Sequence, residues 1–317
     1  MTLCGAAALR TVRGMRAAAE ENPLPQTGEG ESVFATARVV AVFSRSFYLA
    51  NALGGLACIG PAGLGGGPLN MLCALPDGLD WQVAGLRTGD AVSWDGGYLL
   101  AAGRFRFSLA SAVAWRPTPP PMNWDVATLA AGLVLLSRLA ADQAATDGFA
   151  PLVAPLASRR LDDPGISASN SPLLQLAWPC IASLADWLAS GRNAAPPASA
   201  EILIGLGPGL TPSGDDLIGG ALIALRALGH VGMAARLGEW VLPLARQRTG
   251  AISAAHLACA AAGEGSLALH DLIAALLTPD APGLAAAVAT LAAIGHSSGW
   301  DMLAGVALAA AAVANSA

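Results

Sequence analysis

The sequence contains no lysine, and all 17 of its basic residues are arginine. Without lysine the chain cannot supply the phosphate-binding lysine of a Walker-type nucleotide site or the Schiff-base lysine of a pyridoxal-phosphate (PLP) enzyme, so we expect neither cofactor. The formal net charge is −5, and no basic run is longer than Arg159-Arg160. Because nucleic acids are bound through clustered positive charge, we expect no nucleic-acid partner.

Cysteine pairs and long apolar runs are also missing. The five cysteines are odd in number and none has CxxC spacing, which indicates reduced, mostly buried thiols rather than disulfides or a zinc site. The longest charge-free apolar tracts, 126–136 and 302–314, fall short of the roughly 20 residues that a membrane span needs. Arginines interrupt the alanine-rich start where a signal peptide would have its apolar core. We therefore expect a soluble, cytoplasmic protein without a membrane partner.

The spacing of apolar residues in the sequence changes near residue 120. Residues 33–115 contain short apolar runs with period-two alternation, and an Asp95-Gly96-Gly97 turn favours antiparallel pairing. A proline-rich hinge follows at 116–124, and residues 125–317 have Ala- and Leu-rich segments at helical spacing. The sequence predicts an α+β protein, with an N-terminal antiparallel β barrel or sandwich (33–115) followed by a larger all-α domain (125–317).

A polar, sharply bent segment stands between two apolar stretches of the predicted helical domain. It is GLGPGLTPSGDD, residues 205–216, and a helix is expected to begin near Ser213. A glycine-rich loop that enters a helix N-terminus favours anions, because the first N–H groups lack intrahelical partners and the helix dipole is positive there. Asp215 and Asp216 could also hold a divalent cation. The alternative is a capping box formed by Ser213 and Asp216, which requires no function.

A partial second copy of this motif follows at residues 295–305, GHSSGWDMLAG. The shared pattern Ser-Gly-x-Asp-x-x-x-Gly is filled by Ser213, Gly214, Asp216 and Gly220 in the first copy and by Ser298, Gly299, Asp301 and Gly305 in the second. In each copy the last glycine lies one helical turn after the aspartate, where it allows another backbone to approach. We expect both helix N-termini to meet at one pocket that includes Asp216 and Asp301. The alternative is that the second copy repeats only a helix-capping pattern, which requires no function.

Other polar residues are weaker candidates for this site. His296 lies in the second loop, and His256 follows Ser253 by one helical turn, although a buried core histidine is the commoner case. Asn70 is the one candidate from the β region, with a plain turn residue as the alternative. His270, next to an aspartate, is typical of an exposed polar pair and is not a candidate.

The motifs resemble those of a family, formerly of unknown function, that is marked by the string G-x-G-x-G-L-T-P-S-G-D-D. Further stretches that resemble family motifs are GPLN (67–70), RTGAIS (248–253), LHDL (269–272) and GHSSGWD (295–301). The resemblance extends from residue 33 to residue 310. Family members occur as a subunit of oxamate carbamoyltransferase in anaerobic allantoin breakdown, a part of purine catabolism. The resemblance thus implies carbamoyl transfer between oxamate and phosphate, within a complex that contains other subunits.

The implied substrates are small anions, which suit helix N-termini and an arginine. In this hypothesis N–H groups around 207–214 bind phosphate, Arg248 neutralises it, and a histidine carries the proton. The catalytic candidates are His256, His296, Asp216 and Asp301. The substrate-binding candidates are Asn70, Gly207, Gly209, Thr211, Ser213, Gly214, Asp215, Arg248, Ser253, Ser297, Ser298 and Gly299. If the site uses a metal, we expect Mg²⁺ at Asp215, Asp216 and Asp301.

Two other classes of function stay open. A metal-dependent hydrolase of the ADP-ribosyl-glycohydrolase type would gather divalent ions with carboxylates at helix starts. A non-catalytic assembly subunit would use the loops to bind an anion or a partner chain, and the Ala/Leu-rich composition fits burial against partners. Metal analysis separates the first class, and activity of the isolated chain separates the second.

Overall fold

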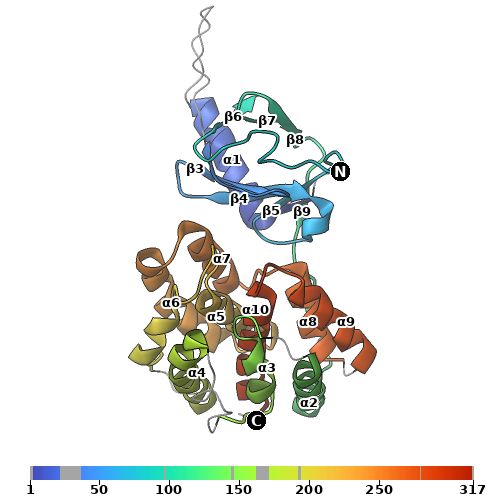
Figure 1. Ribbon diagram of the computed structural model, residues 1–317, viewed down its shortest axis with the longest axis vertical. Coiled ribbons are helices and arrows are strands. Elements are labelled where there is room, and N and C mark those ends of the chain that lie inside the picture. The colour runs from blue at the N-terminus through green and yellow to red at the C-terminus, as the bar shows by residue number, and fades with distance from the viewer. Residues whose placement is uncertain are drawn as a thin grey trace, which may run out of the picture. The chain divides into compact units, whose positions relative to one another are not determined.

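The computed structural model describes residues 3–21, 37–95, 98–143, 146–161, 171–191, 194–278 and 280–315. The chain forms two compact units, Met1–Arg116 and Pro117–Ala317 (Figure 1). The first unit is built on a sheet and the second is helical, so the predicted α+β class is confirmed. Residues 33–36 of the expected β region, and the glycines of the expected Asp95-Gly96-Gly97 turn, lie outside the described residues.

Within the described residues, the first unit contains a curled half-barrel of nine strands in the order β8-β7-β6-β2-β3-β4-β5-β1-β9. The strands are β1 (Leu3–Gly5), β2 (Ala37–Val42), β3 (Phe47–Asn51), β4 (Leu56–Pro61), β5 (Asn70–Cys73), β6 (Ala91–Asp95), β7 (Tyr98–Ala101), β8 (Phe105–Ser108) and β9 (Val113–Trp115). Most neighbours are antiparallel, but β4–β5 and β1–β9 are parallel. The alternation of apolar and polar residues in the sequence predicts which face of the sheet each side chain occupies. It does not indicate whether the neighbouring strand runs parallel or antiparallel.

One helix, α1 (Ala6–Glu21), packs against strands β3 and β4 of the sheet. Its buried apolar positions recur about one turn apart and are Ala8, Val12 and Met15. An aromatic cluster fills the rest of this core, where the ring of Trp81 meets that of Phe47 at 4.9 Å between centroids. All five cysteines of the chain are free and buried, as the sequence predicted.

The second unit is a helical assembly. Its helices are α2 (Val126–Gln143), α3 (Ala150–Ala157), α4 (Pro172–Ser190), α5 (Ser213–Ala227), α6 (Val231–Arg248), α7 (Ala251–Ala261), α8 (Leu267–Leu276), α9 (Ala281–Ala292) and α10 (Ser298–Ala314). Short 3₁₀ turns occur at Ala62–Leu64 in the first unit and Ala198–Leu203 in the second. Helices α5 and α10 are buried over most of their length, and the other helices of the unit surround them.

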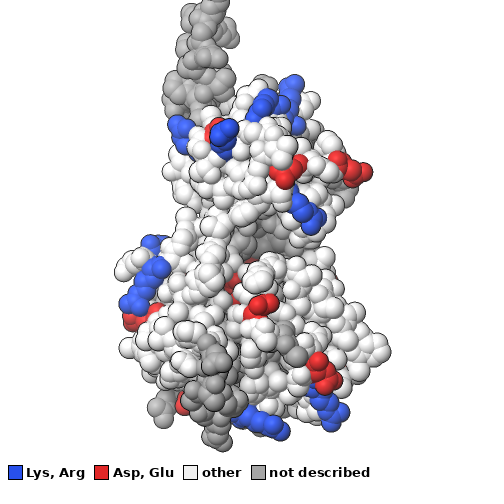
Figure 2. Space-filling view, viewed as in Figure 1, with Lys and Arg blue, Asp and Glu red and all other residues white. Residues whose placement is uncertain are grey.

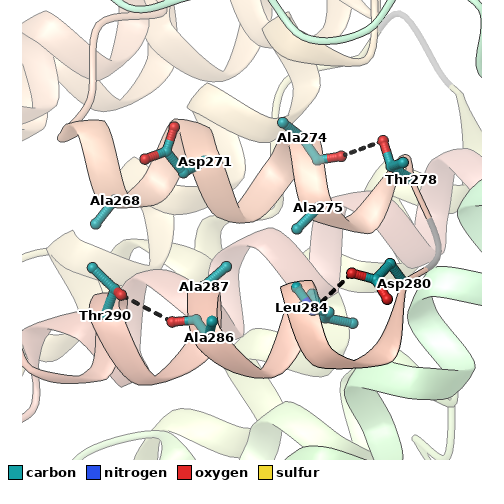
Figure 3. Close-up of a pocket in the computed structure, with 11 residues that line it drawn as sticks. Ala268, Asp271, Ala274, Ala275, Thr278, Asp280, Leu284, Ala286, Ala287 and Thr290 are labelled. Atoms are coloured by element: carbon teal, nitrogen blue, oxygen red, sulfur yellow. Dashed lines mark hydrogen bonds between the residues drawn. The ribbon is translucent and has the colours of Figure 1, made fainter.

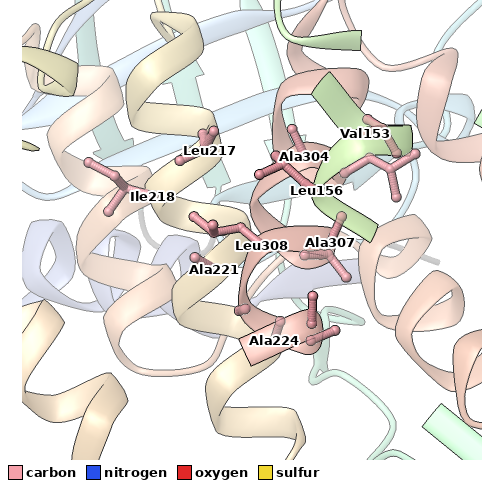
Figure 4. Close-up of a cluster of buried hydrophobic side chains, with 14 of the residues drawn as sticks. Val153, Leu156, Leu217, Ile218, Ala221, Ala224, Ala304, Ala307 and Leu308 are labelled. Atoms are coloured by element: carbon pink, nitrogen blue, oxygen red, sulfur yellow. The ribbon is translucent and has the colours of Figure 1, made fainter. Parts of the chain in front are cut away.

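Helices α5 and α10 lie side by side and run in the same direction. Their side chains pack with those of α3 in one buried apolar cluster (Figure 4). A Cβ at Gly220 would overlap the carbonyl oxygen of Met302, and a Cβ at Gly305 would overlap that of Leu217. Met302 and Leu217 hold equivalent places in the two Ser-Gly-x-Asp motifs. The contact is therefore reciprocal, and the helix pair has a local two-fold relationship that permits close backbone approach.

In the described part of the chain, α2 is the one helix with the length and composition to cross a membrane. It packs against α3, α8, α9 and α10, and Leu129, Leu133 and Leu136 on its inner face are buried. Core helices of globular units pass the same test of length and composition, so α2 alone does not indicate a membrane span.

Candidate functional site

The structure brings the two motif loops together. The hydroxyls of Thr211, in the first loop, and Ser298, in the second, lie 3.1 Å apart. Ser298 also hydrogen-bonds the Asp216 carboxyl, and Ser213 hydrogen-bonds the Asp301 carboxyl. The serine of each motif thus hydrogen-bonds the aspartate of the other motif. The site consists of two crossed serine–aspartate pairs at adjacent helix N-termini.

Asp216 is held in a buried position beneath hydroxyl groups. Burial raises the pKa of its carboxyl well above the ordinary value, and the charge of Asp301 adds to this, while hydrogen bonds from Ser298 and Thr211 oppose it. Its Oδ2 atom is buried and has no hydrogen-bond partner. A buried carboxyl with a raised pKa and a free oxygen is suited to exchange a proton with a neighbouring group.

Asp301 is completely buried, and a backbone group fixes its position. Its Oδ1 accepts a hydrogen bond from the N–H of Phe149 at 2.6 Å, just before α3. Ser213 and Ser297 also hydrogen-bond this carboxyl, although burial still raises its pKa. A Cβ at Gly148 would overlap Oδ1, so the approach of the α3 segment requires glycine there. The Oδ2 atom of Asp301 has no partner.

Asp215 has a different role from its neighbour. Its Oδ1 accepts the N–H of Gly205 at 2.9 Å, and its Oδ2 accepts the hydroxyls of Thr249 at 2.5 Å and Ser253 at 2.7 Å. This carboxylate therefore ties the glycine-rich loop to the start of α7. Asp215 and Ser253, both predicted to contact substrate, are hydrogen-bonded to each other.

The predicted capping boxes do not form. The N-cap of α5 is Pro212 and that of α10 is Ser297, and neither cap makes a side-chain hydrogen bond. Ser213 and Ser298 lie one position inside their helices, and their hydroxyls bond across the pair to the opposite aspartates. The capping alternative is therefore wrong for both motifs, because each serine is committed to the other helix.

The glycines of the loop allow it to fold over the start of α5. Gly205, Gly207 and Gly209 have φ of +77°, +117° and +95°, which residues with a Cβ rarely adopt. The N–H of Gly214 donates to Leu206 at 2.9 Å, and that of Gly299 donates to Ile294 at 3.0 Å. Both of these predicted anion donors are thus bonded within the protein. Gly214 and Gly299 also lie tightly against the carbonyls of Leu203 and Leu291, respectively.

The remaining candidates lie around this centre or away from it. Arg248 forms an ion pair with Glu201 at 2.6 Å. His296 has a side chain that is 90% exposed, with Nε2 3.7 Å from Asp147 Oδ1. His256 lies on α7, and burial lowers its pKa to about 4, so it is neutral at pH 7.

Asn70, a site candidate, and His270, expected to be exposed, each hydrogen-bond backbone outside the two motif loops. Asn70 lies in the first unit, where its amide donates to the carbonyl of Gly65 at 3.0 Å and closes a turn. His270 is buried, and its Nε2 accepts the N–H of Gly265 at 3.1 Å. The expectation that His270 belongs to an exposed pair is wrong, because it fixes the turn before α8.

A groove of about 470 Å³ lies between α8 and α9 (Figure 3). Alanines form much of its lining, and its threonine hydroxyls donate to carbonyls of their own helices. None of the predicted site residues lines it. Across the described ranges, no group of three or more His, Cys, Asp or Glu is arranged to hold a metal ion.

The fold and the site define an α+β protein whose helical unit is organised around a duplicated Ser-Gly-x-Asp helix start. Residues 203–310, which include both copies, match the family model described as oxamate carbamoyltransferase subunit AllH. The chain therefore resembles that subunit over this segment. The match does not extend to the first unit, where GPLN and Asn70 lie. Comparison with curated proteins gave no match, and comparison with solved structures gave none either.

Proposed function

We propose that the protein is a subunit of an oxamate carbamoyltransferase-type complex in allantoin breakdown, which transfers a carbamoyl group between oxamate and phosphate. The observation that carries this proposal is the family match over both motifs, together with the crossed pairs that those motifs form. Neither observation depends on the other, since the match is one of sequence and the pairing is one of geometry.

The crossed pairs have the chemistry that carbamoyl transfer needs. Carbamoyl phosphate and oxamate are small anions, and the aligned N-termini of α5 and α10 place partial positive charge beside them. Thr211, Ser297 and Ser298 are half-exposed residues, so a bound substrate can contact them. Asp216 exchanges the proton, and Asp301 holds the second helix start in place. Positioning and electrostatic stabilisation supply most of the acceleration.

The exposed apolar side chains of the second unit support assembly with other subunits. Exposed apolar side chains in this unit include Val134, Leu176, Ile202, Leu210 and Val231. Charged side chains are sparse on the face shown in Figure 2. In the proposed complex these apolar side chains are covered by partner chains. We place the complex in the cytoplasm, where its metabolite substrates occur.

The test uses the complex purified with its partner subunits and assayed for carbamoyl transfer. Asp216→Asn and Asp301→Asn should each lower the rate, on the order of a hundredfold or more for the proton-exchanging residue, while circular dichroism stays unchanged. Asp271→Asn is the matched control, because Asp271 is exposed on α8. Near-normal rates in both site variants would show that the crossed pairs are not the site of transfer.

A second candidate is a non-catalytic subunit that uses the same loops for assembly. It is favoured by the internal hydrogen bonds of Gly214 and Gly299, which leave fewer donors for a substrate. The isolated chain separates the two: carbamoyl transfer without any partner excludes the assembly role. Binding of partner subunits that is lost when the loop 205–211 is replaced, with activity residing in the partner, excludes the catalytic role.

A further inference from the structure

The two copies of the motif differ in their access to solvent. Ser213, in the first copy, is 1% exposed and its partner Asp301 is fully buried. Ser298, in the second copy, is half-exposed, and its partner Asp216 is buried directly beneath it. The sealed pair, Ser213–Asp301, cannot meet a substrate. The open pair, Ser298–Asp216, presents a hydroxyl to solvent and keeps a carboxyl behind it.

The surroundings of Ser298 match those of an activated hydroxyl. The hydroxyl hydrogen-bonds a carboxyl that can take its proton, and Thr211 Oγ1 lies 3.1 Å from Ser298 Oγ and orients it. The unpartnered Oδ2 of Asp216 can hold the proton once it is transferred. A nucleophile, a base and an orienting group within hydrogen-bond reach are the usual arrangement for covalent catalysis.

We propose that Ser298 is the nucleophile that carries the carbamoyl group during transfer, with Asp216 as its base. This inference rests on the proposed function and deepens it, because it assigns the reaction a covalent intermediate in place of direct transfer between two bound substrates. The sealed Ser213–Asp301 pair acts as a positioning element that holds the start of α10 against that of α5.

The covalent step balances as follows. Ser298 Oγ attacks the carbonyl carbon of carbamoyl phosphate, and its proton passes to the carboxylate of Asp216. The bond between that carbon and the phosphate oxygen breaks, and phosphate leaves with the electron pair. The product is a carbamate ester on Ser298. Attack by the oxamate nitrogen releases the carbamoyl group, and Asp216 returns its proton to Ser298 Oγ. The proton that the oxamate nitrogen loses passes to the released phosphate, which becomes hydrogen phosphate.

Mass spectrometry can detect the ester directly. The purified complex is incubated with carbamoyl phosphate, quenched in acid and cleaved before aspartate, which yields a peptide spanning 280–300. This peptide contains no cysteine, and the whole chain contains no lysine, so the residues most easily carbamoylated by cyanate are absent from it. We expect the mass gain of one carbamoyl group at Ser298, and none when cyanate replaces carbamoyl phosphate.

If the ester is too short-lived to isolate, a kinetic measurement can still detect it. A covalent intermediate lets labelled phosphate exchange into carbamoyl phosphate in the absence of oxamate. Ser298→Ala should abolish exchange and lower transfer by a factor of roughly a thousand or more. Asp216→Asn should lower exchange on the order of a hundredfold. Ser266→Ala is the matched control, because Ser266 is a half-exposed serine beside the start of α8.

The outcomes separate this inference from the proposed function. Transfer by the wild-type complex with neither ester nor phosphate exchange would overturn the covalent step and leave the proposed function standing. Wild-type rates in Ser298→Ala would do the same. A complete complex that transfers no carbamoyl group overturns both. Ser298→Thr, which keeps a hydroxyl, should retain more exchange than Ser298→Ala if the hydroxyl itself reacts.

Discussion

The backbone N–H of Phe149 donates to the Asp301 carboxylate at 2.6 Å, across 152 positions of sequence. Through this bond the segment before α3 is anchored to the start of α10. Asp301 also receives the hydroxyl of Ser213 from α5, so one buried carboxylate joins three helix starts. The centre of the second unit therefore depends on a buried polar group as well as on apolar contacts.

The acid pair should make stability depend on pH. An unfolded aspartate titrates near pH 4, whereas burial raises the pKa of Asp216 and Asp301 in the folded protein. Between those values the folded state binds more protons than the unfolded state. The stabilising contribution is thus complete below about pH 4 and is lost as pH rises through the folded pKa values.

Urea unfolding of the wild type and of Asp216→Asn at a series of pH values measures this dependence. The free energy of unfolding of the wild type should fall relative to the variant as pH rises above about 4. A constant difference across the series would show that Asp216 titrates with an ordinary pKa.

His270 should produce the opposite dependence. Burial lowers its pKa from 6.5 to about 4, so the folded protein resists protonation while the unfolded chain accepts it. The stability contributed by neutral His270 is present above about pH 6.5 and is lost as pH falls toward 4. Relative to His270→Gln, the wild type should lose up to about 3 kcal/mol over that interval, measured by chemical unfolding. Parallel pH curves for the two proteins would contradict this.

The helix contact at Gly220 should tolerate no side chain. A Cβ at Gly220 would overlap the Met302 carbonyl, so Gly220→Ala should cost about 1–3 kcal/mol or more. Gly219→Ala is the adjacent control, because its Cβ would lie 3.8 Å from that of Ala260, an ordinary contact. Alanine there should be neutral or stabilise α5 by up to about 1 kcal/mol. Equal thermal unfolding of both variants would exclude the close contact.

Asp215 should contribute to stability rather than directly to the chemistry. Asp215→Ala removes the acceptor of three donors, from Gly205, Thr249 and Ser253, and should cost roughly 3 kcal/mol or more. Asp215→Asn should cost less, because the two hydroxyls can rotate to accept from the amide. Denaturant unfolding compares the two variants. A small effect of alanine would show that the three donors find other partners.

The local features of the site could be predicted, but the pairing across helices could not. Glycine and proline in 205–212 indicate a helix start near Ser213, and the second motif repeats the local signal, so the two helix starts follow from the sequence. The parallel packing of α5 and α10 determines which aspartate each serine hydrogen-bonds. That packing depends on Gly220 and Gly305, whose contacts lie on the opposite helix.

Two further relationships of the site differ in how far a sequence could indicate them. The N–H of Phe149 has no side-chain signal, so nothing in the sequence indicates its bond to Asp301. Asp215 and Asp216 are adjacent in a helix and so point about 100° apart, which could have predicted their separate partners. The bond of Asp215 to Thr249 and Ser253 agrees with the polar character of the stretch 248–253.

The reciprocal seating of Gly220 on Met302 and Gly305 on Leu217 also has a mechanical consequence. At each glycine the backbone of the other helix fills the space that a side chain would occupy. These two contacts prevent the parallel helices α5 and α10 from sliding along each other, so the pair moves as one rigid body. The spacing between their first turns is then fixed whatever happens around them. If assembly or turnover changes the shape of this unit, the movement therefore falls on the loops 205–211 and 295–297, which precede the two helices.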